Sequence, residues 1–160
     1  PPNVMIDVLQ AAIRAGLGEI GMSGEVLTPE FGPRQRFQLI LTDAPLDATP
    51  MFEGSVCDAC MACAKTCPLD AIGDPTEVTI AGKTYSVGNV NYSACRSCKN
   101  GARPNPNHGS GMPDRLGALC VRSCVDHLDR EKRIDNALEN PFRNRAAWQV
   151  DGLGQTTLQA

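Results

Sequence analysis

The chain has 160 residues, of which 42% are hydrophobic and 21% are charged, and these proportions are ordinary for a globular protein of about one domain. The formal net charge of −3 excludes a strongly basic surface for nucleic acid, and no apolar run is long enough to span a bilayer. Aromatic residues make up only 4% of the chain, so the core has few large rings and would rely on internal cross-links. The eight cysteines are the candidates for those cross-links.

The first predicted element in chain order is an amphipathic helix over residues 3–15, where apolar side chains recur at helical spacing. Gly16 would end this helix and opens a stretch to Gly21 that matches G-x-G-x-x-G. The dinucleotide-binding motif of that form comes after a strand, whereas this stretch comes after a helix. We therefore expect a backbone that closely approaches either a neighbouring element or a flat cofactor.

Strands are predicted at two places further along the chain. Residues 36–42 alternate apolar and other side chains and predict a strand, and the Pro-rich segment 43–50 leads from that strand towards the cysteine-rich part of the chain. Residues 77–80 and 83–87 flank Ala81-Gly82 and predict a β-hairpin with a tight turn.

The most informative stretch is residues 57–68, which read C-D-A-C-M-A-C-A-K-T-C-P. Its cysteines have the C-x2-C-x2-C-x3-C-P spacing of bacterial ferredoxins that bind a [4Fe–4S] cluster, and they are Cys57, Cys60, Cys63 and Cys67. We expect a helix to start at the fourth cysteine, because Pro68 tolerates the missing backbone donor there. In two-cluster ferredoxins the fourth cysteine ligates the other cluster, so this run predicts a second set of cysteines.

The second set has C-x2-C and C-x3-C spacing, and its members are Cys95, Cys98, Cys120 and Cys124. Residues 99–112 form a loop by composition, and a helix predicted to begin at Pro113-Asp114 and to run towards Arg133 would carry the last two cysteines on one face. The crossover rule predicts one cluster on Cys57, Cys60, Cys63 and Cys124 and the other on Cys67, Cys95, Cys98 and Cys120.

Two alternatives to iron–sulfur clusters stay open. Cysteines packed every three residues in one loop have poor geometry for disulfides, and zinc sites use two separate C-x2-C pairs rather than one block of four. The spacing favours iron, and iron-binding cysteines favour a reducing, cytoplasmic setting. The chain begins Pro1-Pro2 without an initiator Met, so we expect a fragment or a processed subunit, for which an upstream export signal would not be visible.

Other candidate residues have simpler interpretations. Arg96, Lys99 and Arg103 flank the second cysteine set, where positive charge would raise a cluster potential or dock an acidic donor, but a solvated basic loop is the interpretation we prefer. His108 and His127 are interpreted as solvated or structural side chains. Residues 131–160, with the single Trp148, predict a strap on this domain or on a partner.

Four blocks of sequence together resemble the C-terminal half of reductive dehalogenases and epoxyqueuosine reductases. They are A-G-L-G-E-I-G at 15–21, T-P-E-F-G-P at 28–33, T-D-A-P-L at 42–46, and the cysteine run at 57–68. The resemblance covers about residues 10–73 well, continues loosely over 91–124 and is absent after that. Both families are corrinoid-dependent reductases that join a nitroreductase-like corrinoid domain to a two-cluster ferredoxin domain.

The resemblance implies an α+β fold in three parts. Residues 1–50 would be a helix-strand piece of the nitroreductase-like, corrinoid-binding domain, and residues 51–130 a 2[4Fe–4S] ferredoxin-type domain with an inserted hairpin and loop. Residues 131–160 would be the C-terminal strap. The corrinoid contacts implied in the first part are Gly16, Gly18, Glu19, Gly21, Pro29 and Gly32.

The implied function is that of an electron-transfer portion of a reductase. Two clusters would pass electrons from an upstream donor to a cobalt centre shared with an N-terminal corrinoid domain or a partner subunit. The families' catalytic acid lies upstream of the glycine stretch, so no catalytic residue is assigned and enzyme activity of this chain alone stays open. The long gap between Cys98 and Cys120, and Val125 where a proline is common, depart from the family pattern. The alternative is a free-standing or subunit-type 2[4Fe–4S] electron carrier without corrinoid, and no feature indicates a substrate.

Overall fold

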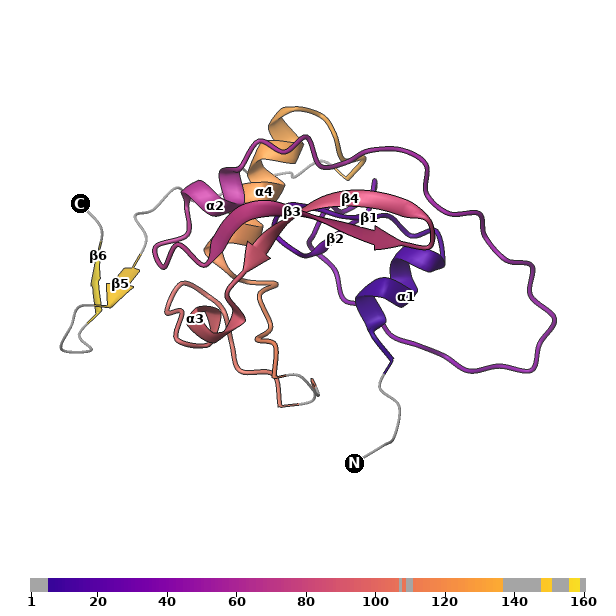
Figure 1. Ribbon diagram of the computed structural model, residues 1–160, viewed down its shortest axis with the longest axis horizontal. Coiled ribbons are helices and arrows are strands. Elements are labelled where there is room, and N and C mark those ends of the chain that lie inside the picture. Colours follow the sequence, from indigo (N-terminus) through magenta and orange to yellow (C-terminus); the bar gives the residue numbers. More distant parts are fainter. Residues whose placement is uncertain (1–5, 107, 109–110, 137–147, 151–155, 159–160) are drawn as a thin grey trace.

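The computed structural model describes residues 6–106, 108, 111–136, 148–150 and 156–158. They form short helices and three two-stranded antiparallel sheets, which pair β1 with β2, β3 with β4 and β5 with β6 (Figure 1). The architecture is therefore mixed α and β, as expected at the level of fold class. Among the described helices, none combines the length and the apolar character needed to cross a lipid bilayer.

Helix α1 (Val8–Arg14) begins later than the predicted start at residue 3. The Asp7 side chain accepts hydrogen bonds from two backbone N–H groups of the first turn and thereby caps the helix, while residues 1–5 lie outside the described residues. The predicted end is confirmed at Gly16, which has a φ of +77°. The backbone N–H groups of Gly16 and Leu17 donate to carbonyls of the last turn, which is the Schellman pattern.

Two hairpins lie in the first ninety residues. β1 (Glu19–Ile20) pairs with β2 (Val26–Leu27), within the segment that contains the glycine stretch. β3 (Ile72–Ile80) pairs with β4 (Lys83–Val90), which confirms the predicted hairpin. Both strands continue further from the turn than the sequence predicted. Its turn has positive φ at both Ala81 and Gly82, at +50° and +84°, as a type I′ turn requires.

The prediction of a helix that begins at Cys67 is wrong. Helix α2 (Ala62–Lys65) lies before that residue and carries Cys63, and the chain turns at Pro68. A further short helix, α3 (Tyr92–Arg96), was not predicted, and Asn91 caps it by accepting a hydrogen bond from the backbone N–H of Ala94. Each of these helices is only about one turn long, and each carries one buried cysteine, Cys63 in α2 and Cys95 in α3.

The predicted start of the last helix at Pro113-Asp114 is also wrong, because α4 runs over Leu119–Arg130. Asp114 forms an antiparallel bridge with Arg103, with two backbone hydrogen bonds of 2.8 Å, and its side chain forms an ion pair with Arg36. These contacts hold residue 114 in extended backbone, so the helix can start only after the chain has turned.

The strand expected over residues 36–42 is not formed. In Figure 1 residues 36–50 lie in a long extended loop that leaves the rest of the molecule, and no described strand pairs with it. Phe37 contacts the core, but Ile40 and Leu41 are 88% and 92% exposed. The apolar alternation that predicted a strand is present, whereas the partner strand is absent from the described residues.

The buried side chains form two clusters. The smaller one lies between α1 and the β3–β4 hairpin and is centred on Ile13, Val26, Ile80 and Tyr85. The larger one joins α4, through Val121, Val125 and Leu128, to Met22, which directly follows the glycine stretch, and to Ile72 of β3. Cys63, Cys120 and Cys124 belong to this larger cluster, and Cys57 packs against it.

Part of the predicted C-terminal strap packs on this chain. Ile134 is buried in the larger cluster, and the backbone N–H groups of Asp135 and Asn136 donate to the carbonyls of Pro29 and Glu30. Further on, β5 (Trp148–Val150) pairs with β6 (Thr156–Leu158), while residues 137–147 lie outside the described residues. The division of the chain at residues 50 and 130 stays a proposal.

Candidate metal centre

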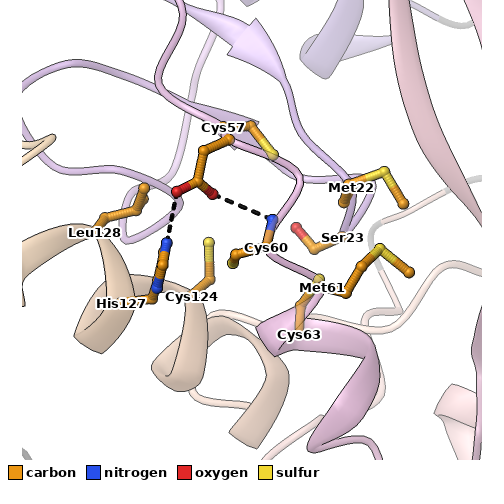
Figure 2. Close-up of a pocket in the computed structure, with 10 residues that line it drawn as sticks. Met22, Ser23, Cys57, Cys60, Met61, Cys63, Cys124, His127 and Leu128 are labelled. Carbon is orange, nitrogen blue, oxygen red and sulfur yellow. Dashed lines mark hydrogen bonds and ion pairs between the residues drawn. The ribbon is translucent and has the colours of Figure 1, made fainter. Parts of the chain in front are cut away.

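Four cysteines from two separate parts of the chain line one pocket. Cys57 and Cys60 come from the loop that leads into α2, Cys63 comes from α2 itself, and Cys124 comes from α4, which packs against α2 (Figure 2). Met22, Ser23, Met61 and Leu128 also line the pocket. We call these four cysteines the first sulfur group.

The loop of the first sulfur group is folded by residues with unusual backbone. Ala59 and Met61 have positive φ, at +56° and +62°, and such left-handed residues turn the chain tightly between successive cysteines. The backbone N–H of Ala62 donates to Cys60 Sγ at 3.5 Å. Hydrogen bonds to sulfur of this kind are a feature of metal-bound thiolates and influence the potentials of iron–sulfur centres.

Glu19, from β1, anchors the start of this loop. Its Oε1 atom accepts hydrogen bonds from the backbone N–H groups of Val56 and Cys57, each at 2.7 Å, and Glu19 is only 6% exposed. A buried carboxylate requires such donors, so the glycine stretch and the cysteine loop are held together by a charge-assisted contact.

A second anchor joins the loop to α4. His127 Nε2 lies 2.7 Å from Asp58 Oδ2, and Asp58 Oδ1 accepts a hydrogen bond from the Cys60 N–H; both contacts are dashed in Figure 2. Burial raises the pKa of Asp58, but the hydrogen bonds from His127 and Cys60 outweigh it and hold that pKa below its usual range. The donor atoms of Asp58, Cys60 and His127 all lie within 4.8 Å of one another, a compact set that would suit a single divalent ion such as zinc.

The remaining four cysteines form the second sulfur group, whose members are Cys67, Cys95, Cys98 and Cys120. Cys67 and Cys98 are both electrostatic neighbours of Cys95, and Cys67 is also a neighbour of Cys120. Backbone N–H groups again donate to sulfur, from Ala71 to Cys67 Sγ and from Asn100 to Cys98 Sγ, each at 3.4 Å.

Each sulfur group takes three cysteines from one of the two sets in the sequence and its fourth cysteine from the other set. Cys67 ends the first cysteine run but lies beside Cys95 and Cys120, while Cys124 ends the second set but lies with the first run. The crossover rule assigns the cysteines to two clusters in the same way, and their role as cluster ligands stays a prediction.

Burial dominates the chemistry of the thiols. It raises the pKa of Cys63 to about 11 and that of Cys120 to about 12, and it raises the pKa of Cys124 further. Neighbouring cysteines add to the effect, because several thiolates at one place repel one another. Such sulfurs become thiolates when a cation neutralises their charge, as a bound metal does.

Sequence reasoning missed Arg115, the buried cation next to the second sulfur group. Its Nη2 atom lies 2.8 Å from Glu25 Oε1, its guanidinium carbon lies 5.3 Å from the centre of the Tyr92 ring, and its side chain is 1% exposed. No local pattern around residue 115 signals this role, because its partners come from distant parts of the chain. By contrast Arg96, Lys99 and Arg103, which flank the second cysteine set, are exposed.

The glycine stretch makes its close approaches to the chain itself. A Cβ atom at Gly16 would lie 2.1 Å from the carbonyl oxygen of Pro50, and one at Gly18 would lie 2.0 Å from that of Leu27. A Cβ at Gly21 would meet the Leu27 side chain at 2.7 Å, and one at Gly32 would meet Leu128 at 3.0 Å. These glycines are explained by neighbouring elements, and the implied corrinoid contacts, including Glu19 and Pro29, stay a prediction.

Comparison with known proteins agrees with the resemblance seen in the sequence. The chain is 39% identical over 64 residues to a tetrachloroethene reductive dehalogenase of Sulfurospirillum multivorans and 41% identical over 64 residues to one of Desulfitobacterium hafniense. It is also 41% identical over 64 residues to an epoxyqueuosine reductase of Synechococcus sp. (strain CC9605). The chain thus resembles both reductive dehalogenases and epoxyqueuosine reductases.

These matches cover only part of each protein. The aligned region is 38% of this chain and 12–13% of the two dehalogenases, and 40% of this chain and 20% of the epoxyqueuosine reductase. No protein-family model matches the chain, and no solved structure matches it significantly.

Proposed function

We propose that the chain is the iron–sulfur electron-transfer portion of a corrinoid-dependent reductase. The observation that carries the proposal is the exchange of Cys67 and Cys124 between the two sulfur groups, since two-cluster ferredoxins exchange the fourth cysteine of each set in this way. The partial relatives, which are named as reductases, support a reductase-type electron-transfer role.

The residues of both groups fit iron–sulfur clusters. Each group provides four sulfurs, the buried thiols of Cys63, Cys120 and Cys124 need a cationic partner to ionise, and backbone N–H groups point at three of the sulfurs. Buried donor atoms of Arg115 lack hydrogen-bond partners among the described residues, which suits a negatively charged acceptor next to the second group. When bound, such clusters accept and release single electrons. The chain itself holds the sulfurs, keeps water from the buried ones and fixes the loop through Glu19 and Asp58.

A larger assembly is part of the proposal. Residues 1–50 would belong to a corrinoid-binding domain whose remainder lies on upstream sequence or on a partner chain, and an electron donor would supply the clusters. The exposed apolar segment 36–42 supports this, because Ile40 and Leu41 need a cover that the described residues do not provide.

A second candidate function is a 2[4Fe–4S] electron carrier without corrinoid. It is favoured by the glycine stretch, because a Cβ at Gly16, Gly18 or Gly21 would collide with atoms of the chain itself, which explains these glycines without a cofactor. Both candidate functions require the two iron–sulfur clusters, and only the corrinoid-dependent reductase also requires cobalt.

The test is the metal content of the chain purified without oxygen, measured as iron, cobalt and zinc per chain. About eight irons would support two [4Fe–4S] clusters. About one cobalt, in chain co-purified with its upstream domain, would support the corrinoid reductase, and iron without cobalt there would leave the electron carrier. Zinc in place of iron, held by the trio of Asp58, Cys60 and His127 or by the cysteines, would overturn both proposals.

A further inference from the structure

Arg115 is a charged side chain enclosed by the protein. The side chain is 1% exposed, and its Nε and Nη1 atoms are buried without a hydrogen-bond partner in the part of the chain that the structure describes. Leaving such donors unpaired destabilises a protein, so an acceptor for them is expected close by. Because these atoms are themselves buried, that acceptor is not bulk solvent.

Sulfurs of the second group are next to this guanidinium. Arg115 is an electrostatic neighbour of both Cys95 and Cys120, and it lowers the pKa of each against the effect of burial. Glu25, which is paired with Arg115, acts on the same two cysteines in the opposite direction. The two sulfurs therefore feel a buried cation and its counter-ion at once.

The first sulfur group has a buried charge of the other sign. Glu19 is 6% exposed and bonds directly to the N–H of Cys57, whereas the basic Lys65 reaches the Cys60 carbonyl from an exposed position. Charges in the interior act more strongly than charges in water, because the local dielectric constant is lower. The interior charge is thus negative at the first group and positive at the second.

We propose that Arg115 raises the reduction potential of the centre held by Cys67, Cys95, Cys98 and Cys120 and keeps it above that of the centre held by the first sulfur group. The inference rests on the proposed function in one respect, the presence of two clusters. Reduction adds one electron from an external donor, with no bond made or broken and no proton required. The added negative charge is stabilised by a cation that its ion pair with Glu25 holds in the protein interior, so Arg115 favours the reduced form.

The experiment is a redox titration of the full chain, monitored by electron paramagnetic resonance, with dithionite as reductant and soluble mediators. In Arg115→Gln we expect one midpoint potential to fall while the other stays in place. Arg115→Lys, which keeps the positive charge, should restore part of the shift. Glu25→Gln removes the counter-ion and should move the same midpoint upwards.

Arg96→Gln is the matched control, because Arg96 comes directly after Cys95 in sequence but is exposed, so its charge is screened by water. Cys98→Ser identifies which signal belongs to the second group, and that signal should have the higher midpoint in the unmodified chain. Opposite shifts in Arg115→Gln and Glu25→Gln are decisive, since a purely structural disturbance would not reverse its sign.

Several results would overturn the inference. They are two intact clusters with no shift in Arg115→Gln, equal shifts of both midpoints, a downward shift in Glu25→Gln, or the higher midpoint on the first group. If Arg115→Gln does not retain iron, Arg115→Lys and Glu25→Gln carry the test alone. An unmodified chain that contains zinc and no iron would instead refute the proposed function on which this inference rests.

Discussion

Glu19→Ala is expected to loosen the start of the cysteine loop. Glu19 Oε1 is the acceptor for the backbone N–H groups of both Val56 and Cys57, and alanine leaves the buried Val56 donor without a partner. Hydrogen bonds to a charged group contribute about 1.5–3 kcal/mol each. Cys57 is half-buried and water can replace part of its bond, so we expect a local cost of about 3 kcal/mol for the pair.

Hydrogen–deuterium exchange of peptides that cover residues 55–61 measures this cost directly. A loss of about 3 kcal/mol in the opening free energy corresponds to exchange that is roughly 150-fold faster. Glu19→Gln is the matched control, because its amide oxygen can still accept both bonds and only the charge is lost. Peptides from α3, which does not pack against β1, should exchange at the unmodified rate.

The same variant separates two roles of Glu19. If Glu19 anchors the loop, Glu19→Ala also weakens the cluster signal of the first sulfur group and spares that of the second. If its role is to contact a corrinoid, exchange at Val56 and Cys57 stays unchanged in the chain alone. Unchanged exchange together with two intact cluster signals would refute the anchoring argument.

Three further changes test the rest of the structure. Cys124→Ser should remove the same cluster signal as Cys63→Ser, a member of the first cysteine run, and leave the other signal in place, as observed by electron paramagnetic resonance. Leu128→Ala, at a site that is 1% exposed in the larger core cluster, should lower the free energy of unfolding by about 2–5 kcal/mol in chemical denaturation. Ile40→Glu, at a site that is 88% exposed, should change that free energy by less than about 0.5 kcal/mol but weaken co-purification with the upstream domain.

Each of these has a contrary outcome. Loss of different signals in Cys124→Ser and Cys63→Ser would contradict the exchange of cysteines between groups. A cost for Leu128→Ala no larger than that of the exposed Leu46→Ala would mean that α4 is not part of the core in solution. Normal assembly of Ile40→Glu with the upstream domain would remove segment 36–42 from the proposed interface.

The pocket lined by Cys57, Cys60, Cys63 and Cys124 agrees with the spacing of the cysteines, which is a local property of the chain, while their role as cluster ligands stays a prediction. The loop over residues 57–67 is short, so the sulfurs it carries must be close, and the cluster rule supplies the exchange of Cys67 with Cys124. The β3–β4 hairpin was predictable for the same reason, since Ala81-Gly82 fixes its own turn.

Features that depend on distant residues could not be predicted. The strand over 36–42 has the right alternation, but a strand exists only when another strand pairs with it. The start of α4 was placed too early because the bridge between Arg103 and Asp114, which keeps residue 114 extended, is not visible in the local sequence. Arg96 is conspicuous in the sequence because it directly follows Cys95, but it is exposed. Arg115 was overlooked because its burial is a property of the folded chain and is not visible in the sequence.

The two sulfur groups are joined through α4 in a way that bears on the direction of electron flow. Cys120 and Cys124 are one helical turn apart, about 6 Å along the axis, with the buried Val121 packed in the same turn. Any electron passing between the groups therefore moves through protein interior and not through solvent. The glycine stretch lies against the first group, since a Cβ at Gly21 would be 3.4 Å from that of Cys57. If a cobalt centre meets this stretch, the first group is its neighbour, and the second group, with Arg115, is the outer site at which electrons arrive and are held.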